Sequence, residues 1–141
     1  MLVATVGYHY AENSAAVERI SALLGGTAQE WYRSGLRKLR AARLGDLCLL
    51  LDAVDQTAAV VRVTDHKRDG RAWVIAYEPF TKKPELPLTA TLRRRLTKAG
   101  LRPTGKAFRS VWLPTMAAAE VVEALYGERL RTRFEKEPAS G

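Results

Sequence analysis

The feature that most constrains the fold is the apolar run LCLLL at residues 47–51, which directly follows Gly45-Asp46. A surface helix needs a polar face and several turns, and this run has neither. A short stretch that is apolar at every position is typical of a strand covered on both faces, so the run predicts a buried central strand. Cys48, the only cysteine of the chain, lies within it and is expected to pack in the core.

Further strands are predicted on both sides of this run, from alternation and β-branched content, at residues 2–8, 58–64, 71–77 and 106–113. The second of these shows the alternation clearly, because Ala59, Val61 and Val63 face one way while Arg62 and Thr64 face the other. Residues 52–57 and Asp69-Gly70 are predicted turns. Residues 79–87 contain three prolines and are predicted to be a loop.

Four helices are predicted. The first runs from a cap at Asn13 or Ser14 to Gly25-Gly26, and the second is a short helix around Leu36 and Leu39 with Arg33, Arg37 and Arg40 on a basic side. The third covers 89–99, and the fourth covers 115–126 with Thr115 as its cap. Residues 27–34 are predicted to be a connection. The pattern predicts one domain over residues 1–127, followed by a charged helix end and a linker-like tail at 128–141. The class is α+β, with helices flanking a curved sheet.

The overall charge indicates which partners to expect. The chain of 141 residues has a formal net charge of +8 and an isoelectric point near 10, which attracts polyanions. Nucleic acid is therefore the first candidate partner and an anionic membrane surface the second. The sequence contains no apolar run long enough for a membrane span and no signal-peptide pattern, so no membrane role and a cytoplasmic location are expected.

Motifs for catalysis are sparse. The chain has two histidines, His9 and His66, one cysteine, and no glycine-rich phosphate loop. His9, between Tyr8 and Tyr10, could act as a general base, but a histidine at a strand end is more often a packing or hydrogen-bonding residue. We therefore expect a binding protein that uses no metal and no cofactor, rather than an enzyme.

The order of these segments resembles the EVE and YTH families of the PUA-like class. The similar stretches are GYHYAEN at 7–13, EWYRS at 30–34, the passage from Gly35 to Val63 with its Gly45-Asp46 turn, PFTK at 79–82, and GKAFRSVWLPTMAAAEVVEAL at 105–125. The resemblance covers about residues 1–126. It implies a PUA-like curved mixed sheet or open barrel flanked by helices, and recognition of a modified base in nucleic acid.

The resemblance assigns the pocket to Trp31, with Asn13, Tyr8, His9 and Tyr32 around it. A base must be flipped out of a duplex to enter such a pocket, and stacking on one aromatic ring returns roughly 1–3 kcal/mol. An asparagine amide both donates and accepts hydrogen bonds, which suits the edge of a base. On the residues alone, a partly buried structural tryptophan is the better reading of Trp31, and the resemblance reverses that preference. Asn13 also suits a helix cap, and Trp73 and Trp112 are expected in the core.

Phosphate contacts are assigned to basic residues in or beside the segments that resemble the rim of the pocket: Arg33, Arg37, Lys38, Lys82, Lys106 and Arg109. YTH proteins complete an aromatic cage with a second tryptophan from the loop after the hairpin. Here the corresponding stretch TDHKRDG, residues 64–70, is read as a short loop and has no aromatic residue. This departure favours an EVE-like pocket over methyl-adenine capture.

Three functions are compatible with this reading. The first is a sensor that recognises a modified cytosine or adenine in DNA within a modification-dependent restriction system, fused to or associated with a nuclease or translocase, as the tail EKEPASG suggests. The second is an RNA-binding PUA-like protein that takes an unpaired base of transfer or messenger RNA. The third is a small enzyme that uses His9.

Overall fold

The computed structural model describes residues 1–6, 30–34, 41–69 and 72–137, and within these the side chains of 5–6, 30–34, 67–69 and 72–75 are left out of the description. The described residues form nine strands and three helices. They are β1 (Leu2–Val6), β2 (Glu30–Ser34), β3 (Leu47–Asp52), β4 (Thr57–Asp69), β5 (Ala72–Pro79), β6 (Leu86–Pro87), α2 (Ala90–Lys98), β7 (Pro103–Thr104), β8 (Ala107–Phe108), β9 (Val111–Trp112), α3 (Thr115–Tyr126) and α4 (Glu128–Lys136).

The main sheet has the strand order β2-β5-β4-β3-β1-β9, with β6 paired to the start of β4. Strands β1 and β3 are parallel, and the other neighbours are antiparallel, so the sheet is mixed. Every residue of β3 is buried, and the strand lies between β4 and β1. The prediction of a central buried strand from LCLLL is therefore confirmed.

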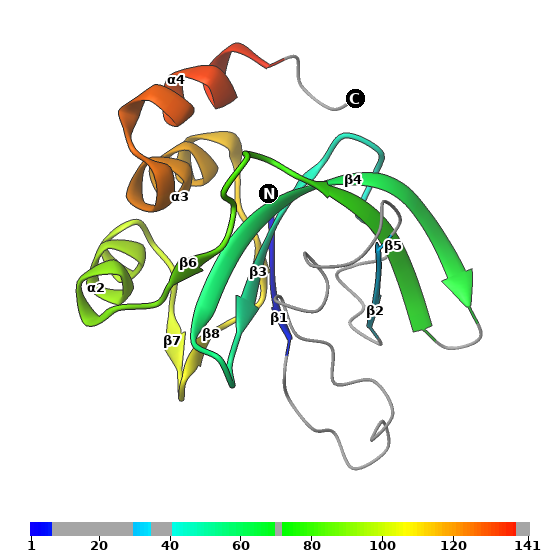
Figure 1. Cartoon of the computed structure of the whole chain (residues 1–141), viewed down its shortest axis with the longest axis horizontal. Coiled ribbons are helices and arrows are strands. Elements are labelled where there is room, and N and C mark those ends of the chain that lie inside the picture. Colours follow the sequence, from blue (N-terminus) through cyan, green and yellow to red (C-terminus); the bar gives the residue numbers. More distant parts are fainter. Residues whose placement is uncertain (7–29, 35–40, 70–71, 138–141) are drawn as a thin grey trace.

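The two faces of the sheet bury different side chains. One face holds Cys48 and Leu50 of β3 in a cluster with Ala59, Val61 and Tyr77, against which the half-buried Trp112 packs. The opposite face holds Leu47, Leu49 and Leu51 together with apolar residues of α2 and α3, among them Leu92, Leu96, Val121, Val122 and Leu125. Figure 1 shows the three helices gathered on one side of the molecule. The core positions predicted for Cys48 and Trp112 are confirmed, while the side chain of Trp73 lies outside the described residues.

Strand β4 curves strongly along its length (Figure 1). Its register with β5 shifts between Val63 and Asp65, which is the irregularity expected where one strand of a pair carries an extra residue and bends. Within the described residues the edge strands β2 and β9 do not pair with each other, so the sheet is not closed into a barrel. The α+β class with a curved mixed sheet is confirmed at this level.

Two predictions for the middle of the chain are wrong. Residues 30–34 were expected in a connection, but they form β2, because the run EWYRS has the aromatic content that suits a strand and finds an open edge at β5. Arg33 is consequently in a strand and not on a basic helix. Residues 64–69 were read as loop, but they extend β4, since a polar strand is stable when it pairs continuously with β5.

The last third of the chain also differs in detail from the prediction. The stretch expected as one strand over 106–113 is divided into β8 and β9 by Arg109 and Ser110. Helix α2 is capped by the Thr89 hydroxyl, which accepts from the Leu92 N–H, but α3 is preceded by Pro114 and has no side-chain cap, so Thr115 is not the cap. After Gly127 the chain forms a separate helix, α4, whose Leu130 and Phe134 pack against the helix-side core. The helix predicted from Asn13 and the rest of the short basic helix lie outside the described residues.

Candidate nucleic-acid interface

The residues predicted to form the base pocket are only partly within the described chain. Tyr8, His9 and Asn13 lie outside it. Trp31 and Tyr32 lie in β2, where the backbone of Trp31 is opposite Ala76 and that of Tyr32 opposite Ile75. The structure therefore shows that Trp31 belongs to an edge strand of the sheet and not to a connecting loop.

The strand order limits how these residues could meet. Strand β2 is at one edge of the sheet, whereas β1, from which the chain leads to Tyr8, is separated from it by β5, β4 and β3. Val6 at the end of β1 pairs with Asp52 of β3, which in turn pairs with Thr57 at the start of β4. Trp31 of β2 pairs with Ala76 of β5, which pairs with Asp65, eight residues further along β4. Trp31 and the end of β1 are therefore separated by three strands of the sheet.

The predicted phosphate ligands divide into three groups. Lys82, in the loop after β5, and Lys106 and Arg109, on either side of β8, have exposed side chains that could reach a phosphate. Arg33 is described only as a backbone position in β2. Arg37 and Lys38 lie outside the described residues.

Most of the net charge of the chain lies in one segment, from which only Lys106 and Arg109 were selected in the sequence prediction. Residues 86–119 contain seven arginine or lysine residues and no aspartate or glutamate, so this segment carries +7 of a total of +8. Six of the seven side chains are exposed: Arg94, Arg95, Lys98, Arg102, Lys106 and Arg109. We call residues 86–119 the acid-free segment. None of its six exposed cations forms an ion pair with a carboxylate of the described residues.

The β7–β8 hairpin brings two of these cations together. Pro103 pairs with Phe108, and one position further out the Arg109 N–H donates to the Arg102 carbonyl oxygen at 2.8 Å. Residues directly opposite in an antiparallel pair point to the same face, so two exposed arginines of like charge lie side by side. Such a pair is unfavourable by itself, and a bound anion relieves the repulsion.

The hairpin is held to the body of the protein by Arg93, the one cation of the acid-free segment that is half-buried. Its guanidinium group donates to Gln56 Oε1 at 2.9 Å and to the carbonyl oxygen of Lys106 at 2.8 Å, and it lies 5.2 Å from the ring centroid of Phe108. Gln56 Nε2 donates to the same carbonyl oxygen at 2.9 Å. The backbone of Lys106 is thus fixed, while its ammonium group is left exposed.

The position of the hairpin is informative because it is at the end of β1. Gln56 belongs to the turn after β3, and Asp52 at the end of β3 pairs with Val6 at the end of β1. Strand β9 runs antiparallel to β1, and β8 contacts both β1 and β3. The basic hairpin therefore lies where the chain leaves the sheet toward the segment that contains Tyr8 and Asn13.

Buried ionisable groups in the described residues have structural roles. Burial raises the pKa of the Cys48 thiol to about 12, so the thiolate that a nucleophile requires is suppressed at neutral pH. Burial also raises the pKa of Tyr126 to about 12, and its hydroxyl accepts from the Val60 N–H and donates to the Pro84 carbonyl. The buried carboxylate of Asp52 accepts from the N–H groups of the turn that follows it.

In the part of the chain that the structure describes, no group of three or more His, Cys, Asp or Glu residues is placed to hold a metal ion. No helix among those described is both long and apolar enough to cross a membrane. Comparison with protein-family models, with curated proteins and with solved structures finds no match to this chain.

Proposed function

We propose that this protein is a non-catalytic module that binds nucleic acid and captures a modified base, cytosine or adenine, flipped out of DNA, in the manner of the EVE and YTH domains that the sequence resembles. Its PUA-like character and a role as the sensor of a restriction system belong to the same proposal. The observation that carries it is the acid-free segment. Its six exposed cations have no carboxylate partner among the described residues, so the segment attracts a polyanion, and two of the cations oppose each other on a braced hairpin.

The phosphate contacts would supply affinity without sequence information, so selectivity must come from a base pocket. Trp31 is the candidate ring for stacking and Asn13 the candidate hydrogen-bonding partner. The hairpin lies at the end of β1, and the chain continues from there along the sequence to Asn13.

A binding titration tests the proposal. Matched DNA oligonucleotides carry 5-methylcytosine, 5-hydroxymethylcytosine, N6-methyladenine or no modification, and RNA oligonucleotides of the same sequence form a second series. The wild type should prefer one modified DNA, and Trp31→Ala should remove that preference. Trp112→Phe is the matched control, since Trp112 packs against the sheet and its replacement should leave the preference unchanged.

The possible outcomes separate the alternatives. A preference for unpaired bases in RNA over every DNA would favour the RNA-binding reading and contradict the DNA assignment. If all modified and unmodified oligonucleotides bind with equal affinity and Trp31→Ala does not change it, the base-pocket hypothesis is refuted. The protein would then be a nucleic-acid-binding module without base selectivity.

A further inference from the structure

The charged side chains of α4 are distributed unequally around the helix. Arg131 is surrounded by three carboxylates, with Glu123 at 2.6 Å, Glu135 at 2.9 Å and Glu120 at 3.0 Å. The hydrogen bonds that Arg131 donates to these carboxylates raise its pKa above its usual range. Arg131 is thus committed to contacts with α3 and with its own helix and is not available to a ligand.

Three other cations of α4 are exposed and have no carboxylate partner among the described residues: Arg129, Arg133 and Lys136. Their spacing of four and then three residues places them on one side of the helix. With a rise of 1.5 Å per residue, they extend over about 10 Å along the axis. We call these three residues the α4 face.

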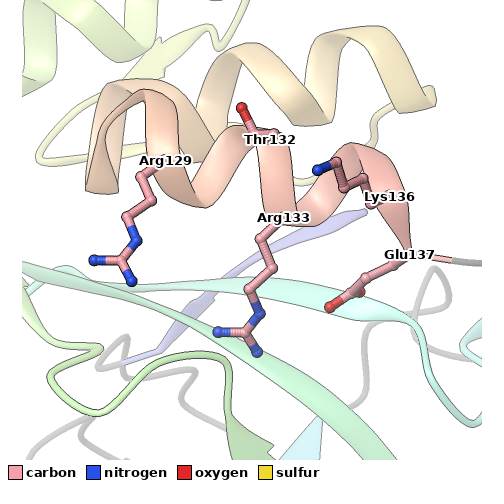
Figure 2. Close-up of a pocket in the computed structure, with 5 residues that line it drawn as sticks. All are labelled: Arg129, Thr132, Arg133, Lys136 and Glu137. Atoms are coloured by element: carbon pink, nitrogen blue, oxygen red, sulfur yellow. The ribbon is translucent and has the colours of Figure 1, made fainter.

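The α4 face borders an open hollow of about 690 Å³ that is also lined by Thr132 and Glu137. Figure 2 shows Arg129 and Arg133 extending from the same side of α4. Glu137, the one acid in the lining, is neutralised by Arg62 at 2.6 Å. Among the residues that the structure describes, the three cations of the hollow therefore have no carboxylate partner.

One of these cations is held in position without a carboxylate. The guanidinium group of Arg133 lies 4.7 Å from the ring centroid of Phe80, which is 2% exposed and therefore fixed in the core. A cation stacked on a ring keeps its N–H groups free for an acceptor. A guanidinium group with free N–H groups is suited to bidentate contact with a phosphate.

We propose that the α4 face is a second phosphate-binding site, which holds the sugar-phosphate backbone of the nucleic acid that also contacts the acid-free segment. This inference rests on the proposed function, because it takes the ligand to be nucleic acid. Three cations spread over about 10 Å match the repeated charges of a phosphodiester strand better than one compact anion. A membrane surface fits less well, because Leu130 and Phe134 pack against the core and leave α4 without an apolar face for lipid.

The two sites are separate surfaces. Helix α3 contacts both α2 and α4 and lies between them. Figure 1 shows α4 at the opposite end of the molecule from the β7–β8 hairpin. An oligonucleotide long enough to contact both sites should therefore bind more tightly than one that reaches only the hairpin.

The test compares Arg129→Gln/Lys136→Gln with the wild type on a 20-nucleotide unmodified DNA duplex across a salt series. This variant keeps Arg133 and its contact with Phe80, so the fold is preserved, and thermal unfolding checks that it is. The slope of log K against log salt should become shallower by about 1.8, which is 0.9 for each lost contact. The charge-preserving control Arg129→Lys should keep the wild-type slope.

Wild-type slope and affinity in the double variant would overturn the proposal. The preference for modified over unmodified DNA, measured in the same titrations, distinguishes the two hypotheses. If the wild type shows no preference but the slope of log K against log salt still becomes shallower in the variant, the base-reading function is refuted. The assignment of the α4 face as a phosphate-binding site is then supported. Vesicles of phosphatidylserine and phosphatidylcholine provide the other arm, and loss of vesicle binding with unchanged DNA binding would assign the site to lipid and overturn the nucleic-acid inference.

Discussion

Neutralising the hairpin cations is the most informative perturbation of the proposed backbone contact. In Arg102→Gln/Lys106→Gln/Arg109→Gln, three exposed cations are removed while the brace formed by Arg93 is kept, because Arg93 contacts the carbonyl oxygen of Lys106 and not its side chain. The variant should therefore fold normally. Its stability should rise slightly, by about 0.2–1 kcal/mol, because the like-charged pair of the hairpin is relieved.

The expected change in binding follows from counterion release. Each phosphate contact contributes about 0.9 to the slope of log K against log salt for duplex DNA, so three contacts contribute about 2.7. Raising the salt from 50 to 200 mM should consequently weaken the wild type by about 40-fold more than the variant. Fluorescence anisotropy with one labelled duplex at four salt concentrations measures this difference directly.

The charge-preserving variant Arg102→Lys/Arg109→Lys is the matched control, since it retains the point charges and loses only the planar guanidinium fork. It should keep the wild-type slope, with at most a few-fold loss of affinity. If the neutralised variant keeps the wild-type slope as well, the hairpin does not contact phosphate, and the reasoning from the acid-free segment is refuted.

Three further predictions concern the elements that support the site. Replacing Tyr126 by Phe leaves the Val60 N–H and the Pro84 carbonyl without the tyrosine hydroxyl, and should lower the free energy of unfolding by about 1–3 kcal/mol in urea titrations, whereas an unchanged midpoint would exclude a stabilising role. Arg93→Gln should weaken DNA binding because it removes the brace of the hairpin, and Arg93→Lys should restore binding in part, since a single nitrogen, Nη1, makes both short hydrogen bonds and an ammonium group can replace it, while the Nη2 contact with the Gly105 carbonyl oxygen at 3.4 Å is lost. Burial raises the pKa of Cys48 from its usual 9.0 to about 12, so the unfolded chain releases this proton first and stability should fall as the pH rises from 9 to 12, by at most about 1.4 kcal/mol per pH unit from this group. Cys48→Ala should show a shallower decline over that range.

The sequence predicted the elements whose stability is local or whose burial is complete. LCLLL was predicted to be a covered strand because it is apolar throughout, and a helix was predicted over 89–99, where the structure has α2 with its Thr89 cap and buried Leu92 and Leu96. Strand β2 was missed because its stability comes from pairing with β5, whose partner residues lie 39 to 47 positions further along the chain. Periodicity within a five-residue window does not reveal such a partner.

The end of the chain was misread for a different reason. Residues 128–136 were interpreted as a frayed helix end because most of them are charged or polar. Only two residues, Leu130 and Phe134, are apolar, and they are four positions apart, as on one side of a helix. Those two side chains attach α4 to the core, and Arg131 attaches it to α3. The cations that remain form the α4 face, which no single sequence motif indicates.

The phosphate contacts remain a prediction. Lys106 and Arg109 were selected from a resemblance, and the structure gives both of them exposed positions beside β8. Arg102 was overlooked, although the absence of any acidic residue from 86 to 119 was visible in the sequence. Its pairing with Arg109 across the hairpin, and the different role of Arg93 as a brace, depend on tertiary contacts that the sequence does not contain.

The most direct test of the central claim is the ratio of the dissociation constants of the wild type for unmodified and modified DNA of one sequence at one salt concentration. A single methyl group buried in an apolar pocket contributes about 0.8 kcal/mol, so the account predicts at least a fourfold preference for one modification. Loss of Trp31 should abolish this preference and weaken binding of the modified DNA by about 1–3 kcal/mol. A ratio of one for every modification, with Trp31→Ala binding like the wild type, would contradict the claim that this protein reads a base.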